Sequence, residues 1–298
     1  MSDKRFLVHG FLPALAAACS FAMMAGLIKL ASVELPAPVL VFLRNLIGLA
    51  IILPIVMPRG LAYLKTTKLK LHMLRSLISL CAMTSFFYAL GQIGLAEATL
   101  LNATSPLFIG ILASLILGES LNRPLVLSLL TGFIGVILIL KPGTELFTSA
   151  ALVGLGSGFF IGCAKIIIRY MASTEPVMRT VFYFSLLSSI YSALPLFWLW
   201  QTPSFRALTI MTLAGLAATI GQMLLTYAFT HNRAVKVAPF TYVTVLIAAL
   251  IGWWIWNEIP DAGSSIGALL VIVACLVITL EGKPLIAWKK KPPPAARD

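Results

Sequence analysis

Long apolar runs separated by short polar breaks dominate the chain from Leu12 to Leu280. Each run is near the length of about 20 residues that an α-helix needs to cross the hydrocarbon core of a bilayer. Strands of a membrane barrel would be about half as long and would alternate polar with apolar positions, so the runs favour helices. The pattern predicts ten transmembrane helices, over residues 9–30, 37–57, 72–91, 97–117, 124–140, 149–170, 177–200, 207–230, 236–256 and 263–281.

Composition supports a membrane protein and argues against most enzyme classes. Hydrophobic residues make up 60% of the chain and charged residues 11%, against roughly 25% charged residues in soluble domains. The sequence has no Cys/His cluster and no GxxxxGK[ST] motif, so it predicts no metal site, no cofactor, no ATP hydrolysis and no catalytic residues. An all-α polytopic membrane protein remains.

The net charge of +12 is distributed unevenly along the chain. If the N-terminus is cytoplasmic, the outer loops hold only Lys141 and Arg206, and Lys29, Arg44 and Lys165 lie within predicted helices. The other 17 basic residues, Arg75 among them, fall on the cytoplasmic side. This is the positive-inside pattern, which places both termini in the cytoplasm and accounts for the charge through the lipid bilayer rather than through a nucleic-acid partner.

Short motifs recur in the two parts of the chain. Tyr88-Ala89-Leu90 returns as Tyr227-Ala228-Phe229, and Gly118-Glu119 returns as Asn257-Glu258 at the same offset. We therefore predict a first five-helix repeat over 9–142, a second over 149–284, and a basic, proline-rich cytoplasmic tail over 285–298. Because five is odd, the second repeat begins on the side where the first ends, so the two repeats are inverted. Inverted repeats allow a site between them to open to either side of a membrane.

Two helices carry stripes of polar or small residues. On the eighth, the stripe recurs every three or four residues and consists of Thr212, Gly215, Thr219, Gln222, Thr226 and Thr230. On the sixth it consists of Gly154, Gly158, Gly162, Lys165 and Arg169. The eighth-helix stripe faces either a watery cavity or a neighbouring helix, and Gln222 is its strongest candidate for contact with a solute. The sixth-helix glycines predict close approach of another helix, and Lys165 either faces a solute or extends to the interface.

Further candidates lie on other helices, each with a structural alternative. Arg44, inside the second helix, either faces a cavity, pairs with Glu34 or extends to the interface. Thr99 and Asn102 share a face of the fourth helix with Pro106, where loosened backbone either coordinates a solute or bends the helix. Three tyrosines either line an apolar pocket or pack between helices: Tyr88, Tyr227 and Tyr242.

All ten acidic residues fall outside the predicted helices or at their ends. Carriers of lipophilic cations and proton-driven pumps commonly use a buried carboxylate. Here the charges inside the helices are positive, which favours a solute with a carboxylate or another anionic group. Glu258 and Glu119 are expected to cap or anchor helix ends.

With ten helices and an acidic residue after the fourth and ninth, the chain resembles the EamA-type carriers of the drug/metabolite transporter superfamily. The supporting stretches are Leu43-Arg44, residues 132–136, Ala238-Pro239-Phe240-Thr241-Tyr242 and Asn257-Glu258-Ile259-Pro260-Asp261. Three stretches are most similar to carriers for S-adenosylmethionine uptake: residues 72–75, 83–85 and 238–261. The resemblance implies a transporter in a bacterial inner membrane.

We therefore expect a facilitative or exchange transporter that moves a small carboxylate-bearing metabolite, such as S-adenosylmethionine or an amino acid, by alternating access. Its partners would be the solute and the bilayer, and a homodimer is compatible with the sequence. The predicted solute-binding residues are Arg44, Tyr88, Thr99, Asn102, Lys165, Thr219, Gln222, Thr226, Tyr227 and Tyr242. The alternatives are a metabolite or multidrug exporter of the same fold and, in another class, a membrane-embedded lipid enzyme or an assembly subunit.

Overall fold

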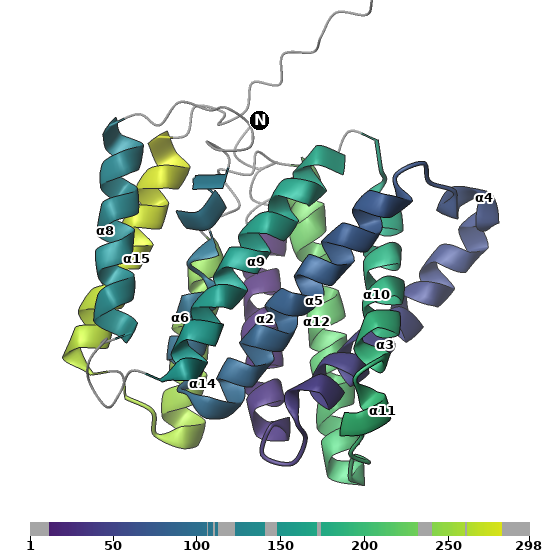
Figure 1. The fold of residues 1–298 in the computed structure, drawn as a ribbon, viewed down its shortest axis with the longest axis horizontal. Coiled ribbons are helices and arrows are strands. Elements are labelled where there is room, and N and C mark those ends of the chain that lie inside the picture. The colour runs from purple at the N-terminus through teal and green to yellow at the C-terminus, as the bar shows by residue number, and fades with distance from the viewer. Residues whose placement is uncertain are drawn as a thin grey trace, which may run out of the picture.

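The computed structural model is a bundle of α-helices that describes residues 12–105, 107–109, 111–112, 123–140, 148–171, 174–231, 240–259 and 261–281 (Figure 1). Its helices are α2 (Leu12–Ala31), α3 (Ala37–Val56), α4 (Leu61–Leu64), α5 (Leu69–Gln92), α6 (Leu95–Asn102), α8 (Arg123–Leu140), α9 (Ser149–Met171), α10 (Val177–Ala193), α11 (Leu196–Leu199), α12 (Phe205–His231), α14 (Phe240–Trp256) and α15 (Ala262–Glu281). These residues contain no β-strand, which confirms the all-helical prediction. The tail predicted at 285–298 and Glu119 lie outside the described residues.

Several helices have the length and apolar composition of membrane spans. Within the described residues, five helices are long and apolar enough to cross a membrane: Leu12–Ala31, Ala37–Arg59, Leu69–Gln92, Ser149–Ile168 and Phe205–Leu225. Two shorter apolar helices cover Val243–Trp256 and Ala262–Ala274. A polytopic membrane protein is therefore supported, while ten complete crossings remain a prediction.

Prolines set the ends of several helices. Pro36 and Pro176 precede α3 and α10 with extended backbone (φ −69°, ψ 152° and φ −63°, ψ 148°), the geometry of a residue that leads into a helix. The single helix predicted over 177–200 is wrong, because α10 ends at Ala193 and α11 follows Pro195. A proline lacks the N–H that would continue the helical hydrogen-bond ladder.

The fourth predicted helix is also interrupted. One unbroken helix over 97–117 is wrong, since α6 ends at Asn102 and a turn follows at Ala103 and Thr104. Leu107 N then donates to Thr104 O at 2.9 Å, a short-range turn bond. The sequence has a proline at position 106, and a proline lacks the N–H that would bond the carbonyl four residues earlier, which accounts for the end of the helix at Asn102.

The two parts of the chain pack with matching contacts. α2 and α9 are the first helices of the two halves, and each packs along a helix of the other half: α2 along α12, and α9 along α5 (Figure 1). In addition, α3 packs on α10, and α8 packs on α15. Two polar clusters mark opposite ends of the bundle. Lys29, near the end of α2, bonds Glu258 and the carbonyl of Ile93, whereas Glu175, just after α9, bonds Thr66. The matched helices α2 and α9 therefore run in opposite directions, as expected of inverted repeats.

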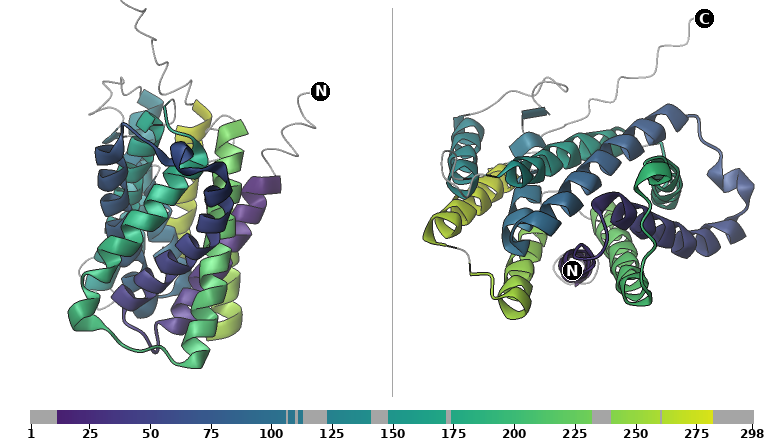
Figure 2. Two further views of the ribbon diagram at one scale, coloured as in Figure 1. Left: turned by 90° about the vertical axis from the view of Figure 1, so that its right-hand side faces the viewer. Right: turned by 60° about the horizontal axis from the view of Figure 1, so that its bottom comes forward.

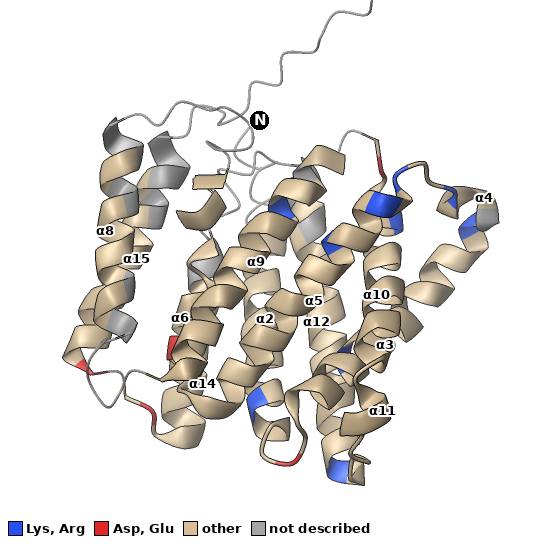
Figure 3. Ribbon diagram, viewed as in Figure 1, with Lys and Arg blue, Asp and Glu red and all other residues tan. Residues whose placement is uncertain are grey.

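Charge is distributed differently at the two ends. At the end that carries α4, Lys and Arg predominate, whereas most of the acidic residues lie near the opposite end (Figure 3). The main apolar core lies between them, where α2 meets α3, α5, α12 and α14. Small residues such as Ala25, Ala214, Ala218 and Ala248 are fully buried there, which allows the helices to approach closely. The two further views show this arrangement of helices from the side and from below (Figure 2).

Candidate functional site

A small pocket lies where α3 of the first part of the chain meets α10 and α12 of the second. Its lining residues are Arg44, Val181, Phe184, Ser185, Thr219 and Gln222. Its volume is about 10 Å³, enough for a single water molecule. The pocket thus brings together three residues that the sequence predicted as solute contacts: Arg44, Thr219 and Gln222.

Glycines allow the helices around this pocket to approach one another. A Cβ at Gly215 of α12 would lie 2.6 Å from Ile47 of α3, so only glycine fits at that crossing. A Cβ at Gly48 would lie 3.4 Å from Thr219 Oγ1 and 3.8 Å from Arg44 Nη1. Because Gly48 has no side chain, no methyl group packs against Thr219 Oγ1 or Arg44 Nη1 at this position.

Arg44 is the charged group of the pocket and is only 5% exposed. Its Nη1 donates to Asn45 Oδ1 at 3.1 Å, and its guanidinium carbon lies 5.7 Å from the centre of the Phe184 ring. Its Nε has no hydrogen-bond acceptor, and no described carboxylate lies within ion-pair distance of it. The predicted alternative of a pair with Glu34 is wrong, because Glu34 accepts from Ser204 instead. An unpaired buried cation is costly, and an anionic ligand would offset that cost.

Other predicted site residues gather at a second place, between α6 and α9. Asn102 Nδ2 donates to Ser157 Oγ at 3.0 Å, and Lys165 Nζ donates to Ser105 Oγ at 3.3 Å. Thr99 Oγ1 donates to Leu95 O at 2.6 Å, within its own helix. The bonds of Asn102 and Lys165 hold the broken fourth helix against α9. None of the three residues lines the pocket beside Arg44.

The remaining predicted residues are not among those that line the pocket. Tyr88 and Tyr227 are 42% and 39% exposed. The side chains of Thr226 and Tyr242 lie outside the part of the chain that the structure describes. Sequence reasoning also missed Phe184 and Ser185, although α10 carries a polar stripe that points to them. That stripe consists of Ser185, Ser188, Ser189 and Ser192, all buried.

A polar cluster closes the end of the bundle near α4. Glu175 accepts from Thr66 Oγ1 at 2.8 Å and Arg179 Nη1 at 3.2 Å, and lies 3.3 Å from His72 Nε2. His72, fully buried, also stacks on Tyr183 with ring centres 4.8 Å apart. Burial raises the pKa of the Glu175 carboxyl, but the bonds from its three partners outweigh burial and hold that pKa below its ordinary value. The cluster joins the segment before α5 to the start of α10, and so joins the two halves.

At the opposite end, Glu258 anchors three elements. It forms an ion pair with Lys29 of α2, and its Oε2 accepts from Leu95 N, at the start of α6, at 2.7 Å. A carboxylate at a helix N-terminus is favourable because the free N–H groups there carry partial positive charge. This confirms the expected anchoring role of Glu258. Lys29 also lies over the Trp256 ring, 5.3 Å from its centre.

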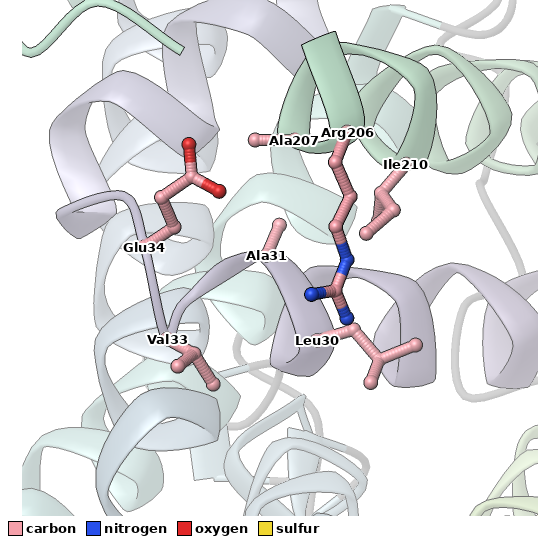
Figure 4. A pocket seen from close by; sticks show the side chains of 7 residues that line it. All are labelled: Leu30, Ala31, Val33, Glu34, Arg206, Ala207 and Ile210. Carbon is pink, nitrogen blue, oxygen red and sulfur yellow. The ribbon is translucent and has the colours of Figure 1, made fainter. Parts of the chain in front are cut away.

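A larger hollow at this end lies between the end of α2 and the start of α12 (Figure 4). Its volume is about 130 Å³ and its lining is Leu30, Ala31, Val33, Glu34, Arg206, Ala207 and Ile210. Its charged residues are exposed, and Glu34 is already bonded to Ser204. We therefore assign the candidate site to the smaller pocket, where the cation is buried and lacks a carboxylate partner.

Known proteins similar to this chain are carriers. The EamA-like transporter family matches it twice, over residues 8–141 and 148–280. The pseudopaline exporter CntI of Pseudomonas aeruginosa (strain UCBPP-PA14) is 33% identical, over 92% of this chain and 96% of its own length. The S-adenosylmethionine uptake transporter of Rickettsia bellii is 29% identical, over 83% of this chain and 85% of its own.

Two further similarities widen the range of relatives. A riboflavin transporter of Vibrio cholerae is 26% identical, over 94% of this chain and 95% of its own. A solved crystal structure shares the fold, with a TM-score of 0.64 at 20% identity over 90% of this chain and 96% of that one. The two family matches cover nearly the whole chain and the named relatives are transporters. The chain therefore belongs to the EamA-like transporter family, as a carrier of the drug/metabolite transporter superfamily and not an enzyme.

Proposed function

We propose that this protein is a facilitative or exchange transporter of a small carboxylate-bearing metabolite, such as an amino acid or S-adenosylmethionine. The observation that carries the proposal is Arg44, a buried cation without a carboxylate partner that lines a pocket between the two halves. Its guanidinium would bind the carboxylate, for which its planar fork of donors is well suited. Thr219 and Gln222 would add hydrogen bonds.

The proposed mechanism is alternating access in a bacterial inner membrane, with ten crossings and both termini in the cytoplasm. The excess of Lys and Arg at the α4 end supports this orientation (Figure 3). A pocket with room for one water does not accommodate a metabolite, so solute binding requires the halves to separate around it. The opposed directions of α2 and α9 support such a movement, because inverted repeats can open toward either side.

An exporter of lipophilic cations is the second candidate from the same fold. The positive charge of Arg44 disfavours it, since a lipophilic cation that has no carboxylate to pair with Arg44 would meet only a like charge in a site of low dielectric. A lipid enzyme or an assembly subunit has no support among the named relatives, which are transporters.

Counterflow into proteoliposomes tests the proposal, with labelled amino acids and S-adenosylmethionine as solutes. We expect Arg44→Gln and Gln222→Leu to lower uptake of the transported solute by roughly tenfold or more, the effect of losing one hydrogen bond to a charged group. Thr209→Leu is the matched control, because Thr209 lies on the exposed side of α12 and its hydroxyl bonds only its own helix. Uptake that is unchanged in both Arg44→Gln and Gln222→Leu would contradict the proposal.

A further inference from the structure

A second buried arginine lies against the same aromatic ring that borders the pocket. Arg75 of α5 is 3% exposed, and its guanidinium carbon lies 4.8 Å from the centre of the Phe184 ring. The corresponding distance for Arg44 is 5.7 Å. Because both distances are measured to one centre, the two charges are no farther apart than their sum. The first half of the chain thus places two cations around one aromatic side chain of the second half.

Neither arginine is neutralised within the described residues. Glu175 pairs with His72 and Arg179, and Glu258 pairs with Lys29. Arg75 Nη1 donates to the backbone carbonyl of Thr180 at 2.9 Å, which leaves its charge uncompensated. The Nε atoms of both Arg44 and Arg75 lack acceptors.

Neutral polar side chains close to the two arginines or to Phe184 in the sequence also lack partners. The buried atoms without a hydrogen bond include Asn45 Nδ2, Ser76 Oγ and Ser188 Oγ. Each lies next to Arg44 or Arg75 in the chain, or one helical turn beyond Phe184 on α10. Buried polar atoms in proteins are usually hydrogen-bonded, so the unsatisfied donors of Arg44, of Arg75 and of Asn45, which contacts Arg44, point to a ligand that supplies acceptors.

We propose that the site holds a solute with two anionic groups, such as a short dicarboxylate, with one group on Arg44 and the other on Arg75. This proposal rests on the proposed function and names the class of its substrate. Two guanidinium groups repel each other at low dielectric, and a single carboxylate on Arg44 would leave Arg75 unpaired. Arg75 is not among the residues that line the pocket beside Arg44, although both guanidinium groups lie against the Phe184 ring. The side chains around Phe184 must therefore rearrange for one solute to reach both cations.

Two charges of the same sign also select against one candidate cargo. S-adenosylmethionine has one carboxylate, one ammonium and one sulfonium group, so it is a net cation. An amino acid with a neutral side chain has no net charge. A solute with two carboxylates compensates both arginines, and we expect it to bind more tightly than either.

The test compares glutarate with its monoamide, glutaramate, which has nearly the same shape and one charge less. Binding to the full-length protein in detergent is measured by tryptophan fluorescence at constant ionic strength, and L-glutamate and L-glutamine form a second pair. We expect the dicarboxylate to bind roughly tenfold or more tightly than the monoamide, the effect of one charge-assisted hydrogen bond. Arg75→Gln should bring that ratio close to one, and Arg75→Lys should retain part of it. Lys70→Gln removes a charge from an exposed position of the same helix and should leave the ratio unchanged.

Equal binding of the two members of each pair, a ratio that survives Arg75→Gln, or no binding of any of the four would overturn the two-anion site. If Arg75→Gln does not fold, the proposal is tested by the ratio of the two affinities in the wild type and by its partial loss in Arg75→Lys. Uptake of monocarboxylates that depends on Arg44 but shows no preference for a second carboxylate would leave the proposed function standing. Uptake that is indifferent to Arg44 would overturn the proposed function itself.

Discussion

Glu258 shows how one carboxylate can hold several helices together. Its two oxygens bond Lys29 and the N–H of Leu95, residues far apart in the chain. A Cβ at Gly252 would lie 3.1 Å from Glu258 Oε2, so the glycine leaves space for the carboxylate. The carboxylate is partly buried, and a neutral side chain in its place would leave the Lys29 ammonium beside Trp256 without a carboxylate partner.

We predict that Glu258→Gln lowers the free energy of unfolding by roughly 1–2 kcal/mol, because the pair with Lys29 is only partly buried and its loss costs more than that of a surface pair and less than that of a buried one. Thermal or denaturant unfolding in detergent measures the effect. Lys29→Met should weaken the protein as well, and the double variant should lose less than the two single losses combined. Strict additivity of the two substitutions would show that the pair does not act as a unit.

At the scale of elements, glycine positions determine how closely α9 approaches the broken fourth helix. A Cβ at Gly154 would lie 3.2 Å from Leu101, and one at Gly162 would lie 3.2 Å from Phe108. At Gly158 a Cβ would clash with Thr104 and would lie 2.8 Å from the Leu101 carbonyl. The spacing of four predicted this close approach from the sequence, and the structure confirms it.

We predict that Gly158→Ala destabilises the protein by about 2 kcal/mol, because the added methyl group forces α9 away from backbone that cannot move independently. Gly156→Ala is the matched control on the same helix, since nothing lies within 4 Å of a Cβ there. That change should be neutral or should stabilise by up to about 1 kcal/mol through helix propensity. The midpoint of thermal unfolding compares the two, and equal effects would contradict the packing argument.

For the whole molecule, the cluster around Glu175 holds the two halves together at the α4 end. Thr66 and His72 belong to the first half, and Glu175 and Arg179 to the second. If the two halves separate at this end, as the proposed alternating access requires, these bonds must break. The charge state of Glu175 therefore affects the stability of the closed arrangement.

We predict that the stabilisation from Glu175 depends on pH. Its folded-state pKa is held below the ordinary value of 4.5, so folding is favoured by the ionised carboxylate. The stabilisation is complete above the unfolded pKa and is lost as the pH falls through the folded pKa. The difference in unfolding midpoint between wild type and Glu175→Gln should thus be large at neutral pH and should shrink below pH 4.5. A difference in midpoint that does not change with pH would contradict this account. Thr66→Val, which removes one of the hydrogen bonds to Glu175, should also lower the unfolding midpoint at neutral pH, but by less than Glu175→Gln.

Much of the helical framework could be predicted because its causes are local. Apolar runs of spanning length, prolines before α3 and α10, and the glycine stripe on α9 all act on their own segment. The stripe on α12 and the isolated charge of Arg44 also singled out three of the six residues that line the pocket. The proline at position 106 had indicated loosened backbone near Asn102, although the segment was still expected to be one helix. The break after Ala193 was missed because the apolar run continues through Pro195, and hydropathy does not reveal the effect of a proline on the backbone.

By itself, the sequence determined that the chain is helical, apolar and divided into two similar parts, because hydrophobic periodicity, turn residues and repeats are properties of the sequence that do not depend on how the helices pack. Only the tertiary structure decided which polar groups meet. It joined Lys29 to Glu258, 229 residues away, and placed Arg75, which the sequence assigned to the cytoplasmic face, against Phe184. Such pairs depend on the directions and crossings of helices that pack far apart in sequence, and no local pattern encodes those crossings.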